Sequence, residues 1–451
     1  MFRSGVLVAL GAAGLLAACS GSDVLDPAAL CHVGVYRTAS NSIIDLAPVA
    51  GADLRWRAFD GQVGRISVGE DGLWSGTTGW TDQPNPARFD LGECGTTRVT
   101  IDGLDGYNGV AERVPLETAE TNFESDGLTL AGRLVMPPGM GPVPIAVWVH
   151  GSEHDSALDW AYAQRMLPAR GVGVFVYDKR GTGASEGEYS QDFEALAGDA
   201  AQALRRAREL AGPRAGRVGF FGGSQGGWVA PLAATMSDAD FVMVSFGMMV
   251  SPTEEDASEV QADLRAAGYD DEVLEQARQV TDVTGQLMAT EFAEGQEEFV
   301  RLKRLWGNED WFREIEGSYS GHMLRNGITG FKFVYLNFID AGTSWGHDSV
   351  AVMNQVDVPV LWVLAGQDRS APPDATRDIL QGMIAQGRDV DLVEFPQTDH
   401  GILEFVETES GRQSTRYADG YFQLLGDWAR DGRIEGPYGQ AVLTPSPEEL
   451  P

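Results

Sequence analysis

The sequence predicts a mostly parallel α/β sheet domain that is preceded by a small β domain and interrupted by a helical insertion. From residue 121 onward, compact apolar runs such as PIAVWVH and VPVLWVLAG alternate with helical stretches, which is typical of a parallel sheet covered by helices. Residues 31–115 instead carry short runs such as LRWRAF and GRISV between Gly, Asp and Pro, the pattern of antiparallel strands. Residues 252–350 are rich in Glu, Gln and Ala at helical spacing, which indicates the insertion.

The composition excludes two classes of protein. The 451 residues carry 33 Lys and Arg against 66 Asp and Glu, a formal net charge of −33, whereas a nucleic-acid binder needs a basic surface. The 43% hydrophobic content is ample for a sizeable core, so global disorder is excluded. We therefore expect a folded protein with no nucleic-acid partner. The sequence gives no indication of its oligomeric state.

The N-terminus resembles a bacterial lipoprotein signal. The apolar stretch Val6–Ala17 is shorter than the ~20 residues that span a bilayer, and the chain continues from it into the motif Leu16-Ala17-Ala18-Cys19. Cys19 would then be acylated and would anchor the protein to a membrane. Ser20, where an inner-membrane retention signal would have Asp, resembles sorting to the outer membrane. The alternative is an ordinary secretory signal with an incidental cysteine.

The two remaining cysteines form an even pair. In an oxidising compartment, Cys31 and Cys94 are predicted to form a disulfide. Closing so long a loop destabilises the unfolded chain by roughly 4 kcal/mol in the chain-entropy model.

These patterns divide the chain into seven segments. A signal peptide and a linker precede the β domain, the first part of the core, the insertion, the second part of the core and a tail without periodicity. The expected boundaries are 1–18, 19–30, 31–115, 121–251, 252–350, 351–433 and 434–451.

The core elements follow in chain order. FESDGLTLAGRLVMP predicts a hairpin, and buried strands are expected at PIAVWVH, GVGVFVYD, GRVGFFG, DFVMVSFG, VPVLWVLAG and DVDLVEF. FEALAGDAAQALRRARELAG repeats apolar residues at three and four positions and ends at Gly212-Pro213, which predicts a helix.

A nucleophile is predicted where the strand GRVGFFG continues through GGSQGG into the helical stretch WVAPLAATM. This is the strand, G-x-S-x-G and helix context of a nucleophile elbow. The sharp turn strains the backbone of Ser224, and Gly222 and Gly226 supply the room that the turn needs. A plain turn serine is the alternative.

A serine hydroxyl needs an imidazole to accept its proton and a carboxylate to orient that imidazole. His400 follows the last apolar run, in the chain order Ser, acid, His, and Asp368 ends the preceding strand. Asp399 is adjacent to His400, and adjacent side chains seldom meet at the imidazole. We therefore expect Asp368 as the acid and interpret Asp399 as loop structure.

Two backbone N–H groups are expected to stabilise an oxyanion. One belongs to Gln225, the residue after the nucleophile, and the other to Ser152 in the loop after the first central strand. That loop, HGSEH, also matches the zinc-protease pattern H-x-x-E-H, which requires a helix. Because Gly151 follows a β-like run here, a helix and a zinc site are disfavoured. His150 is expected to pack under the loop.

With HGS, YDKRGTGASEG, GGSQGG, AGQD and TDHG in this order, residues 121–433 resemble the α/β-hydrolase superfamily. Within it, they are similar to secreted bacterial esterases and to dienelactone-hydrolase-like and prolyl-aminopeptidase-like serine hydrolases. The resemblance implies an eight-stranded core, a Ser224–His400–Asp368 triad and a lid at 252–350. Many relatives carry His where this chain has Gly223, a departure that leaves the triad intact. The β domain resembles no family that we can name.

The leading functional hypothesis is a serine carboxylesterase that forms an acyl-enzyme on Ser224 and needs no metal or organic cofactor. Its substrate would be a small-molecule ester. A serine aminopeptidase is the nearest alternative and would need an acidic lid residue to bind the substrate amine. A non-catalytic surface-binding lipoprotein is the alternative from another class. Haloalkane dehalogenase and epoxide hydrolase chemistry are disfavoured, because on this fold both would require Asp at the position of the nucleophile.

Overall fold

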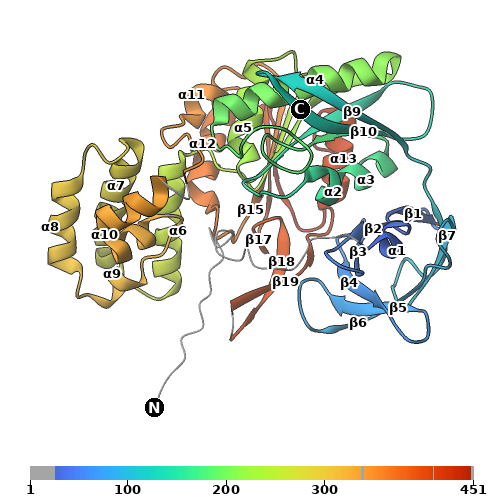
Figure 1. The fold of residues 1–451 in the computed structure, drawn as a ribbon, viewed down its shortest axis with the longest axis horizontal. Helices are drawn as coiled ribbons and strands as arrows, with labels where there is room; N and C mark the ends of the chain where they lie inside the picture. Colours follow the sequence, from blue (N-terminus) through green and yellow to red (C-terminus); the bar gives the residue numbers. More distant parts are fainter. Residues whose placement is uncertain (1–25, 337–339, 410, 448–451) are drawn as a thin grey trace.

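The computed structural model describes residues 26–336, 340–409 and 411–447, and Figure 1 shows three parts. A β-barrel (blue) and a helical insertion (yellow to orange) flank a central α/β sheet domain. The predicted signal peptide and Cys19 lie outside the described residues. Among the helices that are described, none is long and apolar enough to cross a membrane.

The N-terminal part is a closed antiparallel barrel in which β1 pairs with β8. Large side chains such as Trp56 and Phe89 fill its interior, and each is fully buried. Cys31 before β1 is joined by a disulfide to Cys94 before β7, as predicted. The barrel strands are β1 (Gly34–Thr38), β2 (Ile43–Pro48), β3 (Leu54–Ala58), β4 (Val63–Val68), β5 (Trp74–Thr78), β6 (Pro84–Asp90), β7 (Arg98–Asp102) and β8 (Gly109–Arg113).

The central sheet has the order β20-β16-β15-β14-β13-β11-β12-β10-β9, with parallel pairing from β12 to β16. Parallel strands buried on both faces explain the continuous apolar runs of the sequence. The strands are β9 (Glu117–Ser125), β10 (Leu128–Met136), β11 (Val143–Val149), β12 (Gly173–Tyr177), β13 (Ala215–Gly223), β14 (Val242–Ser245), β15 (Val360–Ala365), β16 (Val390–Phe395) and β20 (Val442–Thr444).

The ninth strand corrects the expected eight-stranded core, and it lies in the segment that was expected to be a tail without periodicity. β20 lies in the segment 434–451 and pairs antiparallel with β16 at the sheet edge. Its three residues are too few for a periodic signal. Tertiary contacts hold it instead: Tyr438 is buried, and Ser446 N donates to the Asp391 carboxylate at 2.8 Å.

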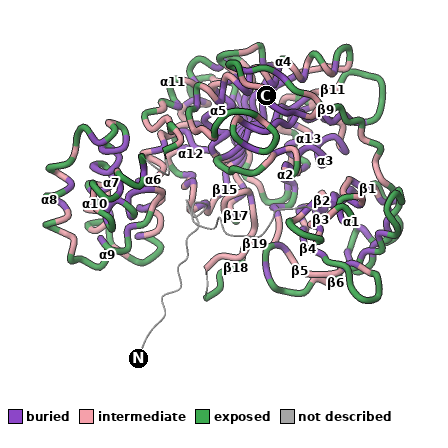
Figure 2. The backbone as a smooth tube through the Cα atoms, viewed as in Figure 1, coloured by how far each residue is buried: buried purple, intermediate pink, exposed green. Residues whose placement is uncertain are grey.

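Helices cover both faces of the sheet, and burial is concentrated between the layers (Figure 2). One face carries α4 (Phe193–Ala211), α5 (Gly226–Thr235) and α12 (Pro373–Ala385). The opposite face carries α2 (Ala157–Trp160), α3 (Ala163–Met166) and α13 (Tyr421–Asp431). The short helices α1 (Pro27–Leu30) and α11 (Ser349–Met353) precede β1 and β15, respectively.

The insertion follows β14 and has a hydrophobic core of its own, which includes Leu264, Phe299 and Met323. Buried Asp256 connects its first helix to its last, because the carboxylate accepts from Tyr319 N and Ser320 N at 2.9 and 3.2 Å. The insertion helices are α6 (Pro252–Ala266), α7 (Asp271–Ala289), α8 (Gln296–Trp306), α9 (Asp310–Glu314) and α10 (Ser320–Val334).

The barrel docks on the central domain through a buried ionic cluster. Asp45 in β2 is fully buried and binds Arg165 of α3 at 2.5 Å and Arg57 of β3 at 3.2 Å. A small antiparallel sheet of β17 (Thr398–Asp399), β18 (Leu403–Thr408) and β19 (Gly411–Tyr417) also reaches the barrel. The chain therefore connects the barrel contact directly to the segment that contains His400.

Candidate active site

Ser224 lies in the sharp turn between β13 and α5. Its φ is +53°, in the left-handed region that a residue with a side chain rarely adopts. A Cβ at Gly222 would lie 2.3 Å from Gly226 O, and one at Gly226 would lie 2.7 Å from Val149 O. Because backbone atoms cannot give way cheaply, only glycine fits at these two positions. The strained turn that the G-x-S-x-G pattern predicted is present.

The structure brings Ser224, His400 and Asp368 together from three loops at one sheet edge. His400 Nε2 lies 3.2 Å from Ser224 Oγ, and His400 Nδ1 lies 2.8 Å from Asp368 Oδ2. Asp368 follows β15, is buried, and also accepts from Ala371 N at 2.8 Å. With Nδ1 donating to Asp368, Nε2 is free to accept the serine proton.

The electrostatics of His400 favour a base that holds its proton well. Burial alone would lower its pKa, but the charge and hydrogen bond of Asp368, the charge of Asp399 and the ionised form of Glu255 outweigh burial and raise the pKa above 6.5. Asp399 contacts the backbone of His400, because its carboxylate accepts from His400 N at 2.9 Å. The same carboxylate binds Arg412 at 2.9 Å. Asp399 is therefore loop structure, as the sequence indicated, and it contributes charge to the imidazole only through space.

The structure explains why position 223, where many relatives carry His, is a glycine in this chain. A Cβ at this position would lie 2.8 Å from the ring of Phe246, which follows β14. That ring in turn packs edge-on against the imidazole of His400 with a centroid separation of 4.9 Å. Phe246 thus occupies the space that a larger residue before the serine would need.

The two predicted oxyanion donors lie in adjacent segments. Gln225 is buried at the start of α5, and Ser152 is exposed in the loop after β11. The segments are in close contact, because a Cβ at Gly226 would lie 3.1 Å from His150 O and one at Gly151 would lie 3.5 Å from Gly223 O. The segments that carry the two predicted donors are therefore in contact next to Ser224.

The loop HGSEH is not helical, so the zinc-protease interpretation fails on geometry. His150 is buried with Nε2 2.7 Å from Tyr177 O, whereas His154 stacks on Tyr189 at 3.5 Å. Within the described parts of the chain, one group of side chains is compact enough to bind a metal. It contains Cys31, His32 and Cys94, and its two sulfur atoms are bonded to each other.

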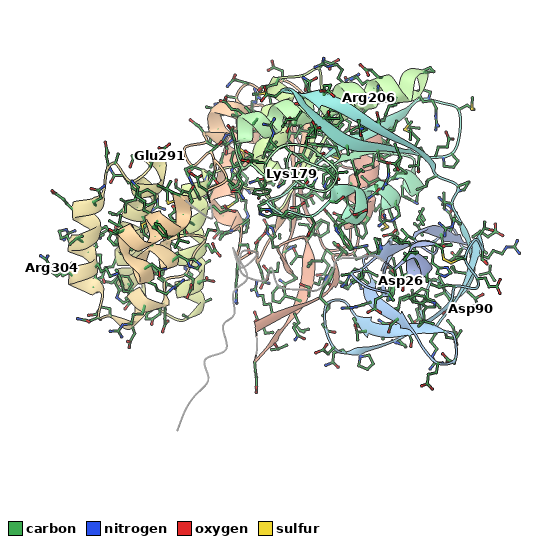
Figure 3. All side chains as sticks on the ribbon, in the orientation of Figure 1. Asp26, Asp90, Lys179, Arg206, Glu291 and Arg304 are labelled. Carbon is green, nitrogen blue, oxygen red and sulfur yellow. A yellow bond between two sulfur atoms is a disulfide. The ribbon has the colours of Figure 1, made fainter. Side chains whose placement is uncertain are left out.

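Sequence reasoning missed Lys179 and recognised Glu255 only as one acid of a Glu-rich helix. Lys179, labelled in Figure 3, follows β12. Its side chain is 1% exposed, and its Nζ donates to Gly151 O at 2.7 Å. Lysine is rare in this chain, with only three among 33 basic residues, which was the available signal. Its neighbour Arg180 fixes the turn through two hydrogen bonds to Asp199, at 2.7 and 2.8 Å.

Glu255 lies in the first turn of α6, where the insertion approaches the triad. Burial raises its pKa to about 8, and Asp368 adds to this rise while His400 opposes it, so its carboxyl is electrostatically coupled to both. Glu259 and Asp263 follow at four-residue spacing, which puts all three acids on one helix face. Burial raises the pKa of Glu259 to about 8 as well.

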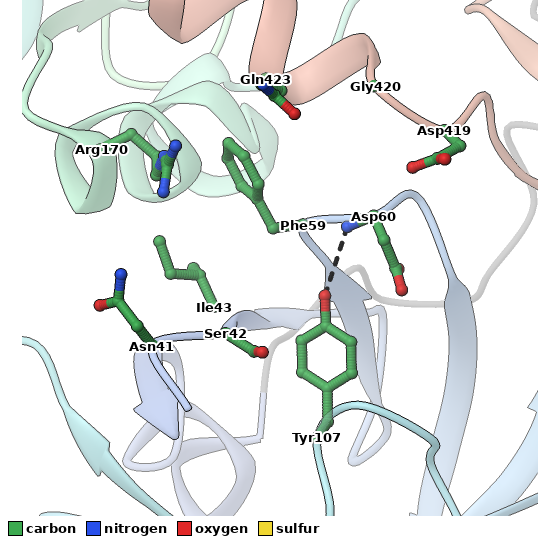
Figure 4. Close-up of a pocket in the computed structure, with 10 residues that line it drawn as sticks. All are labelled: Asn41, Ser42, Ile43, Phe59, Asp60, Tyr107, Arg170, Asp419, Gly420 and Gln423. Atoms are coloured by element: carbon green, nitrogen blue, oxygen red, sulfur yellow. Dashed lines mark hydrogen bonds between the residues drawn. The ribbon is translucent and has the colours of Figure 1, made fainter. Parts of the chain in front are cut away.

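A recess of about 200 Å³ lies between the barrel and the central domain (Figure 4). The barrel contributes residues that include Asp60 and Tyr107, and Asp60 N donates to the tyrosine hydroxyl at 3.3 Å. Arg170 and Gln423 line it from the central domain. It shares no residue with the triad, so we treat it as part of the domain interface.

Comparison with known proteins identifies the class. The model of the alpha/beta hydrolase family matches residues 146–410, more than half of the chain, so this protein belongs to that family of hydrolases. No curated protein gave a significant match.

The solved structures that match this chain include two esterases and an acylaminoacyl peptidase. The Pyrococcus furiosus esterase Pf2001 is 13% identical, with a TM-score of 0.40, over 63% of this chain and 84% of its own. Est1E from Butyrivibrio proteoclasticus, solved with ferulic acid bound, is 15% identical, with a TM-score of 0.40, over 69% and 97%. Pyrococcus horikoshii acylaminoacyl peptidase is 13% identical, with a TM-score of 0.43, over 87% and 57%.

Proposed function

We propose that the protein is a serine carboxylesterase that uses Ser224 as nucleophile, His400 as base and Asp368 as the orienting acid. The observation that carries the proposal is the continuous hydrogen-bond path from Ser224 Oγ through the imidazole to Asp368 Oδ2, at 3.2 and 2.8 Å. The strained backbone of Ser224 supports it, because strain at a reactive residue persists only where the surrounding structure enforces it. Neither a metal nor an organic cofactor is needed for this chemistry.

The proposed reaction proceeds through an acyl-enzyme in two stages. Ser224 Oγ attacks the ester carbonyl carbon while His400 Nε2 takes the hydroxyl proton, and Asp368 stabilises the resulting imidazolium. The backbone N–H groups of Gln225 and Ser152 donate to the negatively charged oxygen. The imidazolium then protonates the leaving alcohol. Water, deprotonated by the same imidazole, then attacks the acyl-enzyme, and the imidazolium returns this proton to Ser224 Oγ as the carboxylic acid leaves.

Turnover of p-nitrophenyl esters from acetate to laurate tests this proposal, with Ser224→Ala as the paired variant. We expect wild-type hydrolysis with a chain-length optimum that reports the size of the acyl pocket. The variant should lose a factor of about 10⁴ or more in kcat, because the nucleophile is gone. The oxyanion donors and binding contacts that remain account for any residual rate. Equal rates for the two proteins would contradict the proposal.

A second candidate, a serine aminopeptidase, is favoured by the position of Glu255. A carboxyl group whose pKa is raised to about 8 by burial and by Asp368 regains its charge when a cation binds beside it. The ammonium group of an aminoacyl substrate is such a cation. We therefore propose that the insertion acts as a lid and that its acidic face, Glu255, Glu259 and Asp263, favours substrates that carry a free amine.

The comparison that decides between the two candidates is aminoacyl and prolyl naphthylamides against uncharged esters, in wild type and Glu255→Gln. If the amine binds Glu255, the variant should raise KM for the aminoacyl substrates by about 10- to 100-fold, the loss expected for a desolvated charge pair. KM for uncharged esters should stay unchanged. Equal effects on both substrate classes would contradict amine recognition.

We also propose that the mature chain is lipid-anchored at Cys19 in a bacterial cell envelope, on the outer membrane. The lipobox-like end of the apolar N-terminal stretch carries this proposal. Metabolic labelling with an alkyne fatty acid should mark the wild type and leave Cys19→Ala unlabelled. Label retained in Cys19→Ala would contradict it.

A further inference from the structure

The loop after β11 is held from behind by two side chains whose roles the triad does not explain. Lys179 is 1% exposed, and its Nζ donates to Gly151 O at 2.7 Å. The Tyr189 hydroxyl donates to Ser152 O at 2.6 Å. Two consecutive peptide groups of the loop therefore have their carbonyl oxygens fixed by buried or half-buried donors.

Because Lys179 fixes the Gly151 carbonyl, the geometry of the peptide bond also fixes the direction of the Ser152 N–H. A trans peptide is planar, so its C=O and its N–H point in opposite directions. The peptide whose carbonyl is Gly151 O carries the N–H of Ser152. A Lys179 ammonium that holds this carbonyl on one side therefore directs the Ser152 N–H to the other side.

The order of the strands in the sheet indicates which loops lie on each side of the Gly151–Ser152 peptide. β11 lies between β12, which leads into Lys179, and β13, which leads into Ser224. All three strands run parallel, so the three loops leave the same edge of the sheet. The Gly151 carbonyl points toward the β12 side, and the Ser152 N–H consequently faces the β13 side, where the nucleophile is.

We propose that Lys179 is a positioning residue that sets the Ser152 N–H as an oxyanion donor, with Tyr189 as a second support for the same loop. The proposal rests on the proposed serine-hydrolase function and adds a residue to it. Lys179 touches neither substrate nor triad and acts through the Gly151–Ser152 peptide. An ammonium also polarises the peptide that it binds, which strengthens the N–H at its other end as a donor.

Neighbouring groups complete this support. Lys179 Nζ lies 4.7 Å from the centre of the Tyr189 ring, a cation–π contact that helps a buried ammonium. Burial lowers the pKa of Lys179 to about 8, and the Glu153 carboxylate partly offsets that effect. Glu153 accepts from Gly151 N at 3.3 Å, so both ends of Gly151 are held.

Tyr189 also connects the loop to the chain returning from the insertion. Its hydroxyl accepts from Gln191 Nε2 at 2.8 Å, and Gln191 Oε1 accepts from Thr343 Oγ1 at 2.8 Å. Thr343 lies between the insertion and α11. The support for Ser152 O is therefore anchored where the insertion joins the central domain.

The test compares Lys179→Met with Lys303→Met. Met keeps the length of the side chain and removes the donor. Lys303 is a matched control that lies in the insertion. Its Nζ also donates to a backbone carbonyl, that of Leu324, and lies 5.9 Å from the centre of the Phe299 ring. Three quantities are measured: kcat and KM for an ester, affinity for a trifluoromethyl ketone whose hemiketal oxygen is charged, and hydrogen exchange of the peptide covering 146–154.

We expect Lys179→Met to lower kcat by about 10²-fold, as loss of an oxyanion donor does, with KM nearly unchanged. Affinity for the ketone should fall with kcat, and loop exchange should quicken. Lys303→Met should leave all three unchanged. A purely structural role would change thermal stability without separating kcat from KM. Unchanged kcat, ketone affinity and loop exchange in folded Lys179→Met would overturn the proposal.

Two further arms keep the outcome decisive. If Lys179→Met does not fold, Tyr189→Phe decides: it removes one hydroxyl and should lower kcat by roughly fivefold, the value of one hydrogen bond, and an unchanged kcat overturns the proposal. If the wild type has no turnover and Ser224 is unreactive, the proposed function fails instead. Positioning is then judged by hydrogen exchange alone, and an unaltered loop in Lys179→Met overturns it.

Discussion

At the scale of single residues, the turn at Ser224 depends on two glycines that have no room for a side chain. Gly222→Ala would put a Cβ 2.3 Å from Gly226 O, a clash that only backbone movement relieves. We expect kcat to fall by at least about 100-fold, since small displacements of a nucleophile are costly. Ester turnover and thermal unfolding of the purified variant measure the effect.

Gly198→Ala is the matched control for this substitution. Gly198 lies inside α4 with no atom close to where its Cβ would be. Alanine there should stabilise the protein by up to ~1 kcal/mol and leave activity intact. An active Gly222→Ala variant with normal stability would contradict the elbow geometry.

The pH dependence of activity follows from the charges around His400. The neutral imidazole is the base, and Asp368 and Glu255 raise its pKa above 6.5, so the imidazolium persists to higher pH than usual. kcat/KM should therefore rise with pH through an apparent pKa above 6.5. Glu255→Gln removes a carboxyl group whose ionised form raises the pKa of His400, and it should move this limb to lower pH. Profiles recorded over roughly pH 5 to 9 measure the shift.

Glu254→Gln is the control for the pH profile. Glu254 is adjacent in sequence, but its carboxylate binds Arg278 of α7 at 2.6 Å. Its removal should leave the acidic limb unchanged. A limb that moves to higher pH in Glu255→Gln would contradict the electrostatic account of His400.

The sequence was sufficient to predict the three residues of the proposed triad because each follows a recognisable strand and the elbow has a fixed spacing. Lys179 and Glu255 could not be found in this way. A buried lysine gives no periodic signal, and helical periodicity cannot tell which acid of α6 faces His400. Their positions depend on how separate elements pack.

At the scale of elements, the disulfide stabilises the barrel. It joins residues 63 positions apart, and its loss should destabilise the barrel by roughly 4 kcal/mol, because the unfolded chain gains the freedom of an open loop. Denaturant unfolding of Cys94→Ser against the oxidised wild type measures this. The reduced wild type should match the variant, and a barrel equally stable in all three proteins would contradict the prediction.

The elements that the sequence predicted best were the long periodic ones. Strand and helix alternation placed the buried strands from β11 to β16, and the helix expected to end at Gly212 ends there as α4. β20 was missed because three residues at a sheet edge have no period. Closure of the β domain into a barrel depends on the β1–β8 pairing, which is long-range and invisible to local patterns.

At the scale of the whole molecule, Asp45 is the group that holds the barrel on the central domain. It is fully buried between Arg165 and Arg57. Asp45→Asn would leave two buried guanidinium groups without a counter-charge, and we expect a loss of about 3–5 kcal/mol. Limited proteolysis should then cleave between barrel and core sooner, and denaturant unfolding gives the energy.

The exposed pair of Arg65 and Asp53 is the matched control on the same barrel. Its side chains are 50% and 26% exposed at a separation of 2.7 Å, so Asp53→Asn should cost less than about 1 kcal/mol. Equal effects of the two substitutions would contradict the role of the buried cluster. The sequence could not predict this docking, because Asp45 and Arg165 are ordinary charged residues until the fold buries them.

The central claim is that Ser224 is an activated nucleophile, and covalent labelling with a fluorophosphonate tests it most directly. We predict one adduct per chain, mapped by mass spectrometry to Ser224, with Ser224→Ala unlabelled and His400→Ala labelled far more slowly. A folded wild type that remains unlabelled, or that is labelled at another serine, would contradict the account.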